Sequence, residues 1–398
     1  MVDGPEEYRA GARMRTVENL PVVTYLSMDS VTSTVGASQV LAYVERLAER
    51  GLRLDLVTFE ESSDDGVARR LADGGVAWRP QPFGRRGPVG GLGRVVRASR
   101  LLRGAQLVHA RSDMAAAATM LAGVDRWLWD VRSLWVDQKV ATGVVRAGSL
   151  EERIFRWVER RSAWRASALV TLTASVVDEL ERRHGVQLAD RTRVVTTCVD
   201  LDRFAMSPMP GSGPIRVLLS GTLNRYYDVD AMLAVVAELQ RRRPVELVVA
   251  SPGVTEWEDD FIGMEVSRVS AVPEEMPELV ASCHVGLCIC RDDAGVSLSA
   301  AMPTKIGEFL AVGRPVVVNP GLVDAAGLVE SWRAGVVQGS ARPGSLVDAV
   351  DQIEALVADS GTPGRCRALA ADHFDLDAGV SALLDAYADV AEAGEGTP

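Results

Sequence analysis

The chain has 398 residues, 47% hydrophobic and 24% charged, which is too long for one ordinary core and predicts two domains. A formal net charge of −11 argues against a nucleic-acid binder, which would carry a basic surplus. No stretch approaches 18 consecutive apolar residues, so no membrane-spanning helix is expected. The five cysteines are odd in number and scattered, which fits a reducing cytoplasm better than a disulfide framework.

Short β-rich runs alternate with longer amphipathic segments, which is typical of parallel α/β architecture. Residues 1–19 carry charges and no apolar run, so we expect a disordered tail and no signal peptide. Helices are expected at 38–50 and 150–166, among others. Strands are predicted at 22–28, 52–59, 76–80, 107–110, 128–131, 168–172 and 193–196, and the pattern restarts at 216–220, 246–250, 267–271, 285–290 and 315–318.

A segment with three prolines and two glycines, residues 202–214, separates the two series and is the expected linker. It divides an N-terminal Rossmann-like domain at 20–201 from a C-terminal one at 215–375. Residues 376–398 follow the last predicted strand, and their helical periodicity predicts a C-terminal helix followed by a tail. Two doubly wound units facing each other place ligands in a cleft at the carboxyl ends of their strands.

The first candidate site is the loop at 31–40, Val-Thr-Ser-Thr-Val-Gly-Ala-Ser-Gln-Val, between the first strand and the first helix. Gly36 would let the backbone approach a ligand, and the amides around Gly36 and Ala37 would face a phosphate at the helix start. The loop lacks the GxGxxG pattern of dinucleotide binding. A capped turn without a ligand fits the sequence equally well.

A stronger candidate is Met-Pro-Thr-Lys-Ile-Gly-Glu at residues 302–308. Pro303 is expected at the first helical position with Thr304 close behind it, so that the free amides of the helix start face outward, with the Lys305 cation beside them. Glu308 follows at i+3 on nearly the same face, where a carboxylate can accept two hydrogen bonds from a ribose diol. The alternative is a surface ion pair between Lys305 and Glu308, which the combined features disfavour.

This segment resembles the donor-binding motif of glycosyltransferase family 4, in the branch that reads Pro-Thr-Lys-x-x-Glu. The resemblance implies a retaining enzyme of the GT-B fold, two Rossmann-like domains facing across a cleft, with the C-terminal helix crossing back to the N-terminal domain. Glu308 matches the glutamate that binds the ribose of the donor. The common pattern has a second glutamate eight positions earlier, which contacts the donor sugar, and this chain has Ala300 there.

Other stretches within residues 20–330 resemble the same branch. His109-Ala-Arg111 matches its next site strand, and residues 129–135 match an Asp-x-Arg-Gly block in which Ser133 replaces glycine. Within that block, Asp130, Arg132 and Trp135 are candidates for binding the acceptor. An internal ion pair is the favoured alternative for Asp130 and Arg132.

The loop at 220–224 resembles the phosphate-facing loop that opens the second domain. Gly221 and Thr222 match it, whereas Asn224 replaces a frequent glycine. The usual downstream lysine is absent, which leaves Arg225 as the nearest cation.

The expected chemistry needs neither a metal nor a cofactor. We find no obvious catalytic nucleophile and no DxD that is expected to hold a divalent metal. The leaving diphosphate would therefore be stabilised by Lys305, Arg225 and backbone amides, an electrostatic role like that of an oxyanion hole. His109 or Arg111 is expected to contact the donor sugar, and the catalytic candidates are therefore His109, Arg111 and Lys305. A purely structural role is the alternative for His109. The cysteines are expected to be buried thiols and not zinc ligands.

A basic stretch lies outside this site. Arg94, Arg97, Arg100 and Arg103 recur every three residues on an expected helix, and residues 83–110 contain no acid. Such a helix can contact anionic lipid or a phosphorylated acceptor. A solvated helix face is the favoured interpretation.

Together these features predict a cytoplasmic retaining glycosyltransferase, peripheral at the inner membrane surface if the basic helix binds lipid. The donor is a nucleotide-diphosphate sugar, with UDP the expected nucleotide, and the acceptor is a small molecule, a lipid-linked group or a saccharide. Two alternatives stay open: a non-catalytic GT-B subunit that activates a partner transferase, and a nucleotide-sugar epimerase.

Overall fold

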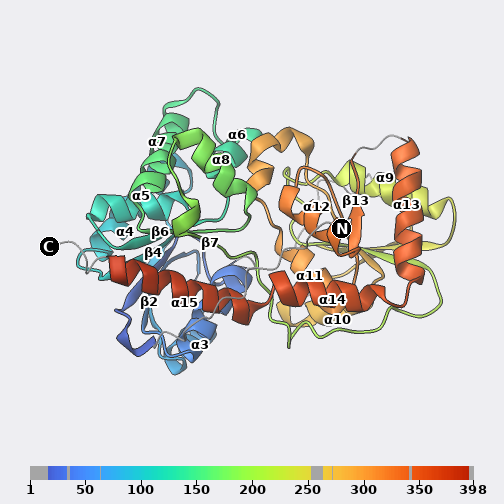
Figure 1. Cartoon of the computed structure of the whole chain (residues 1–398), viewed down its shortest axis with the longest axis horizontal. Coiled ribbons are helices and arrows are strands. Elements are labelled where there is room, and N and C mark those ends of the chain that lie inside the picture. The colour runs from blue at the N-terminus through green and yellow to red at the C-terminus, as the bar shows by residue number, and fades with distance from the viewer. Residues whose placement is uncertain are drawn as a thin grey trace, which may run out of the picture.

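Two parallel sheets, one in each half of the chain, organise the fold (Figure 1). The computed structural model describes residues 17–33, 36–62, 64–251, 263–270, 272–339 and 343–393. The described part begins with a short helix, η1 (Val17–Asn19), so the tail expected at 1–19 lies outside the description except for these three residues.

The N-terminal sheet has the strand order β3-β2-β1-β4-β5-β6-β7, with every neighbouring pair parallel. The order reverses between β1 and β4, and ligands of such sheets bind at the carboxyl ends of the strands beside this reversal. The strands are β1 (Val23–Ser27), β2 (Leu54–Glu60), β3 (Ala77–Pro82), β4 (Leu107–Arg111), β5 (Trp127–Val131), β6 (Ala168–Thr171) and β7 (Thr192–Val194).

Helices cover both faces of this sheet because its strands are apolar on both sides. One core contains side chains of α2 (Ala42–Glu49) and α3 (Asp65–Asp73), and the other contains side chains of four further helices. The expected first helix is in two parts, the π-helix η2 (Ala37–Leu41) and α2. The opposite layer consists of α4 (Gly87–Leu101), α5 (Asp113–Ala122), α7 (Leu150–Arg165) and α8 (Ser175–His184), while α6 (Trp135–Ala141) precedes α7 at the domain junction.

The C-terminal sheet has the order β10-β9-β8-β11-β12-β13 and is also parallel. Its strands are β8 (Ile215–Ser220), β9 (Val245–Ala250), β10 (Val266–Arg268), β11 (Val285–Cys288), β12 (Val316–Val318) and β13 (Gly335–Val337). β13 was not expected from the sequence.

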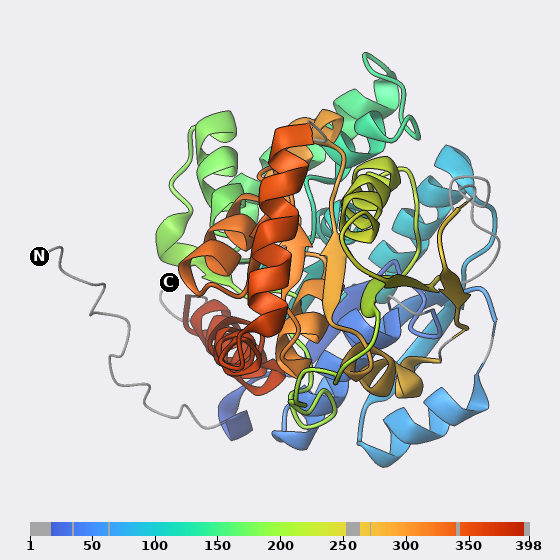
Figure 2. The same ribbon diagram turned by 90° about the vertical axis from the view of Figure 1, so that its right-hand side faces the viewer.

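Two helices, α9 (Val229–Gln240) and α13 (Pro343–Ala358), run side by side over one face of the C-terminal sheet (Figure 2). The other face is covered by α11 (Thr304–Val312) and α14 (Thr362–His373). The remaining elements are α10 (Met276–Ala281), α12 (Val323–Ser331) and the short helices η3 (Ala189–Arg191), η5 (Pro273–Glu275) and η6 (Asp292–Ala300).

The last helix, α15 (Leu376–Ala393), returns to the N-terminal domain (Figure 1). Leu376, Val380, Leu383 and Tyr387 belong to the same buried core as α2 and β1. An ion pair of 2.8 Å joins Asp377 at its start to Arg46 of α2. The crossover implied by the family resemblance is therefore present. None of the described helices is long and apolar enough to cross a membrane.

Candidate active site

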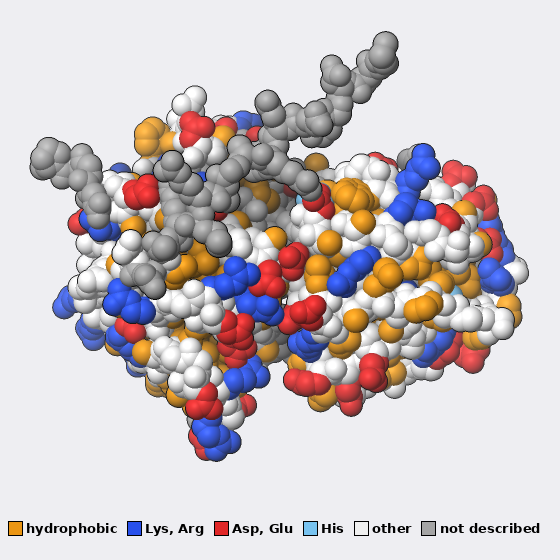
Figure 3. Space-filling view, turned by 60° about the horizontal axis from the view of Figure 1, so that its bottom comes forward, with side chains coloured by type: hydrophobic (Ala, Val, Ile, Leu, Met, Phe, Trp, Pro, Cys, Tyr) orange, Lys and Arg blue, Asp and Glu red, His pale blue; other side chains and the backbone are white. Residues whose placement is uncertain are grey.

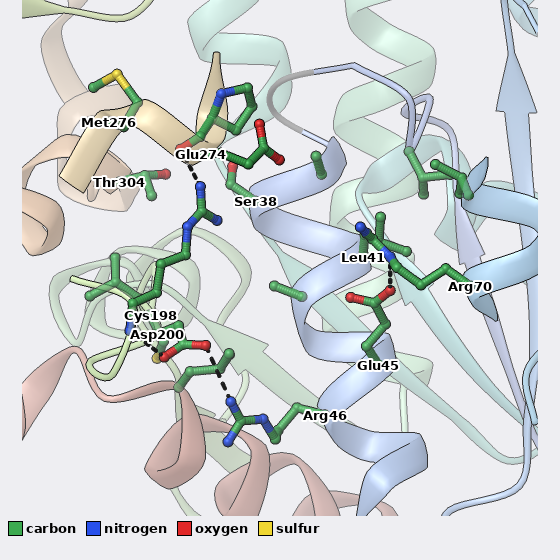
Figure 4. Close-up of a pocket in the computed structure, with 18 of the residues that line it drawn as sticks. Ser38, Leu41, Glu45, Arg46, Arg70, Cys198, Asp200, Glu274, Met276 and Thr304 are labelled. Atoms are coloured by element: carbon green, nitrogen blue, oxygen red, sulfur yellow. Dashed lines mark hydrogen bonds and ion pairs between the residues drawn. The ribbon is translucent and has the colours of Figure 1, made fainter. Parts of the chain in front are cut away.

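A cleft of about 640 Å³ lies between the two domains. Charged side chains of both signs gather along the junction of the two lobes, where the surface is hollowed (Figure 3). In the close-up of Figure 4, Ser38 and Leu41 on the first helix of the N-terminal domain lie opposite Thr304 and Met276 of the C-terminal domain. Glu308 lines the same cleft.

Helix α11 begins at Thr304 with its amino end at this cleft. Pro303 is the cap residue, with an extended backbone (φ −60°, ψ 132°), so its expected position inside the first turn was wrong by one residue. Proline fixes φ near its helical value and removes one donor. The Ile306 amide donates back to the Pro303 carbonyl (3.0 Å). The amides of Thr304 and Lys305 have no intrahelical acceptor, and at the positive end of the helix dipole they can bind an anion.

Lys305 is buried beside the end of β8, with 8% of its surface exposed. Its Nζ lies 4.0 Å from the centre of the Tyr227 ring. Gly221, which follows β8, has φ +80°, and a Cβ there would lie 3.6 Å from the same nitrogen. Within the ranges that the structure describes, no carboxylate forms an ion pair with this ammonium. A buried cation without a counter-charge suits an anionic ligand.

The Glu308 carboxyl lies one helical turn beyond Thr304. Burial raises its pKa, and the nearby charges of Lys305 and Arg203 act in the opposite direction. Among the described residues it has no hydrogen-bond partner, so its oxygens are available to accept from a ligand. Thr304, Lys305 and Glu308 are thus brought together, as expected, with Gly221 beside them.

The glycine loop is shaped by the chain itself. A Cβ on Gly36 would lie 1.9 Å from the carbonyl oxygen of Ser30, so this position needs glycine for its own turn and not for a ligand. Glu60 at the end of β2 holds the loop. Its carboxylate accepts from the Val31 amide (3.1 Å) and the Thr32 hydroxyl (3.2 Å). Ala37 lines the cleft. Glu60 was not among the residues predicted from the sequence, in which it is marked only as an acidic residue at the end of a predicted strand.

A chain of polar side chains runs from the N-terminal core to α11. The Nε2 of Gln39 in η2 donates to the Thr304 hydroxyl (2.7 Å), and Arg132 donates to the Gln39 carbonyl. Arg132 also pairs with Asp130 at 3.5 Å. Burial acts to raise the pKa of Asp130, but Arg132 and His109 outweigh it and lower this pKa to about 2. Asp130 and Arg132 form the internal ion pair that was the favoured interpretation.

His109 belongs to the same series of hydrogen-bonded side chains and is buried, with 1% of its surface exposed. Its Nδ1 is 2.8 Å from the Tyr387 hydroxyl, its Nε2 is 3.2 Å from Asp130, and its ring stacks on Tyr25 at 4.0 Å. Burial lowers its pKa, against the effect of Asp130, so the ring is neutral near pH 7. Both ring nitrogens are occupied and the ring does not line the cleft, which favours the structural role over contact with a sugar.

The remaining candidates are Arg111, Trp135, Thr222 and Arg225. Arg111 ends β4 and is buried, with one guanidinium nitrogen 3.8 Å from Asp29 in the loop after β1. Trp135 begins α6, and its ring packs 4.3 Å from Phe155 of α7. Thr222 and Arg225 are exposed in the loop after β8. None of these four residues lines the interdomain cleft.

Ala300 lies where the two domains touch. It ends η6 and is fully buried among side chains of the N-terminal domain. Beside it the Thr173 hydroxyl donates to the Ser299 carbonyl (2.6 Å), and Asp324 of α12 accepts from the amide of Ala174 (2.6 Å). A glutamate at position 300 would be buried in this contact, which gives a packing reason for alanine.

No group of three or more histidine, cysteine, aspartate or glutamate side chains within the described ranges is placed to hold a metal ion. All five cysteines are free and buried, as expected.

The arginines of α4 form the favoured solvated face only in part, since Arg97 and Arg100 are exposed and Arg94 is half-buried. Arg94 lies over the Phe83 ring at 4.0 Å and donates to the carbonyl groups of Phe83 and Arg85. Arg97 donates to the Pro82 carbonyl, and Arg103 lies beyond the end of the helix. The first two arginines therefore fasten α4 to the preceding loop.

Two family models match the chain, one for each domain. The model described as glycosyl transferase 4-like domain matches residues 36–198, and the model described as glycosyl transferases group 1 matches residues 214–358. The chain is a glycosyltransferase of the GT-B type. No protein of curated function matches its sequence significantly.

Solved GT-B structures share this fold. Sucrose-phosphate synthase from Thermosynechococcus elongatus matches over 94% of this chain and 100% of its own, with a TM-score of 0.69 and 16% identity. HepE from Anabaena in complex with UDP matches over 95% and 100%, with a TM-score of 0.64 and 14% identity. Its complex with UDP-glucose matches over 94% and 100%, with a TM-score of 0.63 and 15% identity.

Proposed function

We propose that this glycosyltransferase moves a sugar from a nucleotide-diphosphate sugar, with UDP the expected nucleotide, to a small-molecule, lipid-linked or saccharide acceptor. Transfer retains the anomeric configuration and needs no metal ion. One observation carries the proposal: a buried lysine in the first turn of α11 has no ion-pair partner among the described residues, and the carboxyl of Glu308 three residues later lines the interdomain cleft.

In this proposal the donor diphosphate lies against the start of α11 and the loop at Gly221. Lys305 and the free amides of the first turn neutralise the charge that develops on the leaving diphosphate, as fixed dipoles do in an oxyanion hole. The Glu308 carboxylate accepts from the two ribose hydroxyls. UDP and UDP-glucose in the complexes of HepE, which has the same fold, support this choice of donor.

A second candidate is a non-catalytic GT-B subunit that activates a partner transferase. One observation favours it: the position at which the family resemblance expects a sugar-binding glutamate is Ala300, and that residue is buried in the domain contact. The two candidates differ in whether the purified chain releases nucleotide from a bound donor.

Titration calorimetry with UDP, GDP and dTDP would test the donor site. Lys305→Met should weaken binding of the diphosphate, whereas Lys139→Met is a matched control, because Lys139 is the other lysine and also lies over an aromatic ring, that of Trp135 at 5.8 Å. Equal affinities in the two variants would contradict the proposed site.

Nucleotide release from the corresponding sugars, with and without EDTA, would then test catalysis. Release that persists in EDTA supports the metal-free transferase. Binding without release, by the chain alone and with a range of acceptors, favours the subunit.

A further inference from the structure

The outer face of α7 is an exposed surface that the donor site does not use. Four apolar side chains project from it into solvent: Leu150 is 71% exposed, Ile154 49%, Trp157 55% and Trp164 53%. Val144, in the turn that leads to α7, is 68% exposed. Single exposed apolar residues are ordinary, but two tryptophans with two aliphatic residues on one helix face require an explanation.

The other exposed residues of α7 are all arginines, namely Arg153, Arg160, Arg161 and Arg165. None of them forms an ion pair within the described part of the chain, and the guanidinium of Arg161 lies 5.6 Å from the Trp157 ring centre. Arg156 differs, because it turns inward to Asp137 and Glu152. The acids of α7 are buried or only partly exposed.

The eight exposed residues share one side of the helix. At 100° per residue they fall within an arc of about 140°. The apolar side chains occupy the middle of this arc together with Arg161, and the other three arginines lie at its margins. Arginine stems can cover apolar surface while their charged ends reach outward, and tryptophan is favoured where an apolar phase meets water.

We propose that this α7 face, defined by Leu150, Ile154, Trp157 and Trp164 with the four arginines, binds an anionic lipid surface, with the helix lying in the plane of the interface. An apolar stripe between arginines matches an acyl boundary beneath anionic headgroups. Charge complementarity selects this occupant over a second copy of the chain, because pairing two copies of this face would bring eight arginines together. The inference goes beyond the proposed function and does not depend on it.

The position of the α7 face in the fold determines which part of the protein would touch the lipid surface. Helix α6, which leads into α7 through Val144, packs on η6 of the C-terminal domain. In Figure 1 α6 and α7 lie along the upper edge of the N-terminal domain, with α6 beside the C-terminal domain. A lipid surface bound there touches the N-terminal domain next to the domain junction, and leaves α15 on the opposite side of the sheet free.

Vesicle flotation with the full chain tests the proposal, using phosphatidylcholine alone and an equimolar mixture with phosphatidylglycerol. We expect binding to the mixed vesicles at low salt and at least about tenfold weaker binding to phosphatidylcholine alone. The double variant Trp157→Ser/Trp164→Ser should lose binding at every salt concentration. The triple variant Arg153→Gln/Arg160→Gln/Arg165→Gln should bind at least about tenfold more weakly at low salt, since each surface arginine is worth about fivefold.

Two variants on exposed residues of the C-terminal domain serve as controls. Val323→Ser removes a side chain that is 53% exposed on α12, and Arg241→Gln removes a charge at the end of α9. Both should bind as the wild type does. Unchanged melting temperature and UDP affinity would show that the α7 variants are folded. The proposal is overturned if the mixed vesicles do not bind, if the α7 variants bind as the wild type does, or if the tryptophan variant abolishes only self-association in sedimentation.

Discussion

The side-chain amide of Gln39 donates to the hydroxyl of Thr304 over 2.7 Å, joining the first helix of the N-terminal domain to the first residue of α11. Gln39 is in turn held by Arg132, which belongs to the buried ion pair with Asp130. The first residue of the proposed donor site is therefore tied directly to the core of the opposite domain. The position of α11 is coupled to that core through this bond.

Thr304→Val should loosen that coupling, because valine has nearly the shape of threonine and cannot accept the bond. A net loss of about 0.5–1.5 kcal/mol is expected for one such hydrogen bond. Hydrogen exchange should become about 2- to 10-fold faster at the amides of η2 and the first turn of α11. Thr304→Ser keeps the hydroxyl and should exchange like the wild type, so equal acceleration in both variants would contradict the role of the bond.

The affinity for nucleotide should depend on pH through Glu308. Only the ionised carboxylate accepts two ribose bonds, and burial raises its pKa above the ordinary 4.5. The affinity for UDP-glucose, whose diphosphate has no ionisation of its own near neutrality, should therefore be constant near pH 7 and fall as the pH is lowered through this raised value. Glu308→Gln should bind about 10- to 100-fold more weakly at pH 7, as expected for losing bonds to a charged acceptor, and be flat over the acidic range. Titration calorimetry of the wild type and the Glu308→Gln variant between pH 7.5 and pH 5 measures both affinities.

Gly36→Ala should distort the loop after β1. The φ of Gly36 is −65°, which alanine also adopts, so the expected damage is steric and comes from the Ser30 carbonyl oxygen. We expect a loss of about 1–3 kcal/mol in the free energy of unfolding, as in overpacked sites. Gly93→Ala is a control of opposite sign, because no atom lies within 4 Å of its Cβ and alanine favours the helix α4. Thermal unfolding should rank the two variants on either side of the wild type.

The buried hydrogen-bonded side chains of Tyr387, His109, Asp130 and Arg132 should make the free energy of unfolding decrease in acid. The folded pKa values of His109 and Asp130 are both below their ordinary values of 6.5 and 3.8. As the pH falls, the unfolded chain therefore takes up protons before the folded protein does. The contribution of His109 to the free energy of unfolding is complete above pH 6.5 and is lost as the pH falls below it. The Asp130 part follows between 3.8 and about 2.

His109→Asn should lower the melting temperature at pH 7, because it leaves Tyr387 and Asp130 with a poorer partner. It should also reduce the fall in melting temperature between pH 7 and pH 5. An unaltered slope would mean that His109 does not titrate as its environment indicates.

Much of the fold follows from local pattern. Apolar runs of β-branched residues such as β8 and β12 predicted the strands, because parallel strands covered on both sides contain few polar residues. β13 was missed because it has three residues and begins with glycine, which leaves no period to detect. The motif at Thr304, Lys305 and Glu308 could be predicted because its residues lie within one helical turn and their geometry is local.

Contacts between distant segments could not be predicted in this way. Gln39 was interpreted only as part of the glycine loop, because its partner Thr304 lies 265 positions away. The role of His109 stayed open because Tyr387, which occupies one of its nitrogens, is 278 positions away in α15. Ala300 is explained only by the docking of the two domains, which no local pattern encodes.

The return of α15 has a consequence for how the protein can be made and divided. The face of the first sheet that carries α2 is completed by Leu376, Val380, Leu383 and Tyr387. A fragment cut at the linker would expose that face to water, and a chain leaving the ribosome must wait until residues 376–393 have emerged before its first-made half is sealed. The N-terminal domain therefore cannot complete its fold until the end of the C-terminal half has been synthesised.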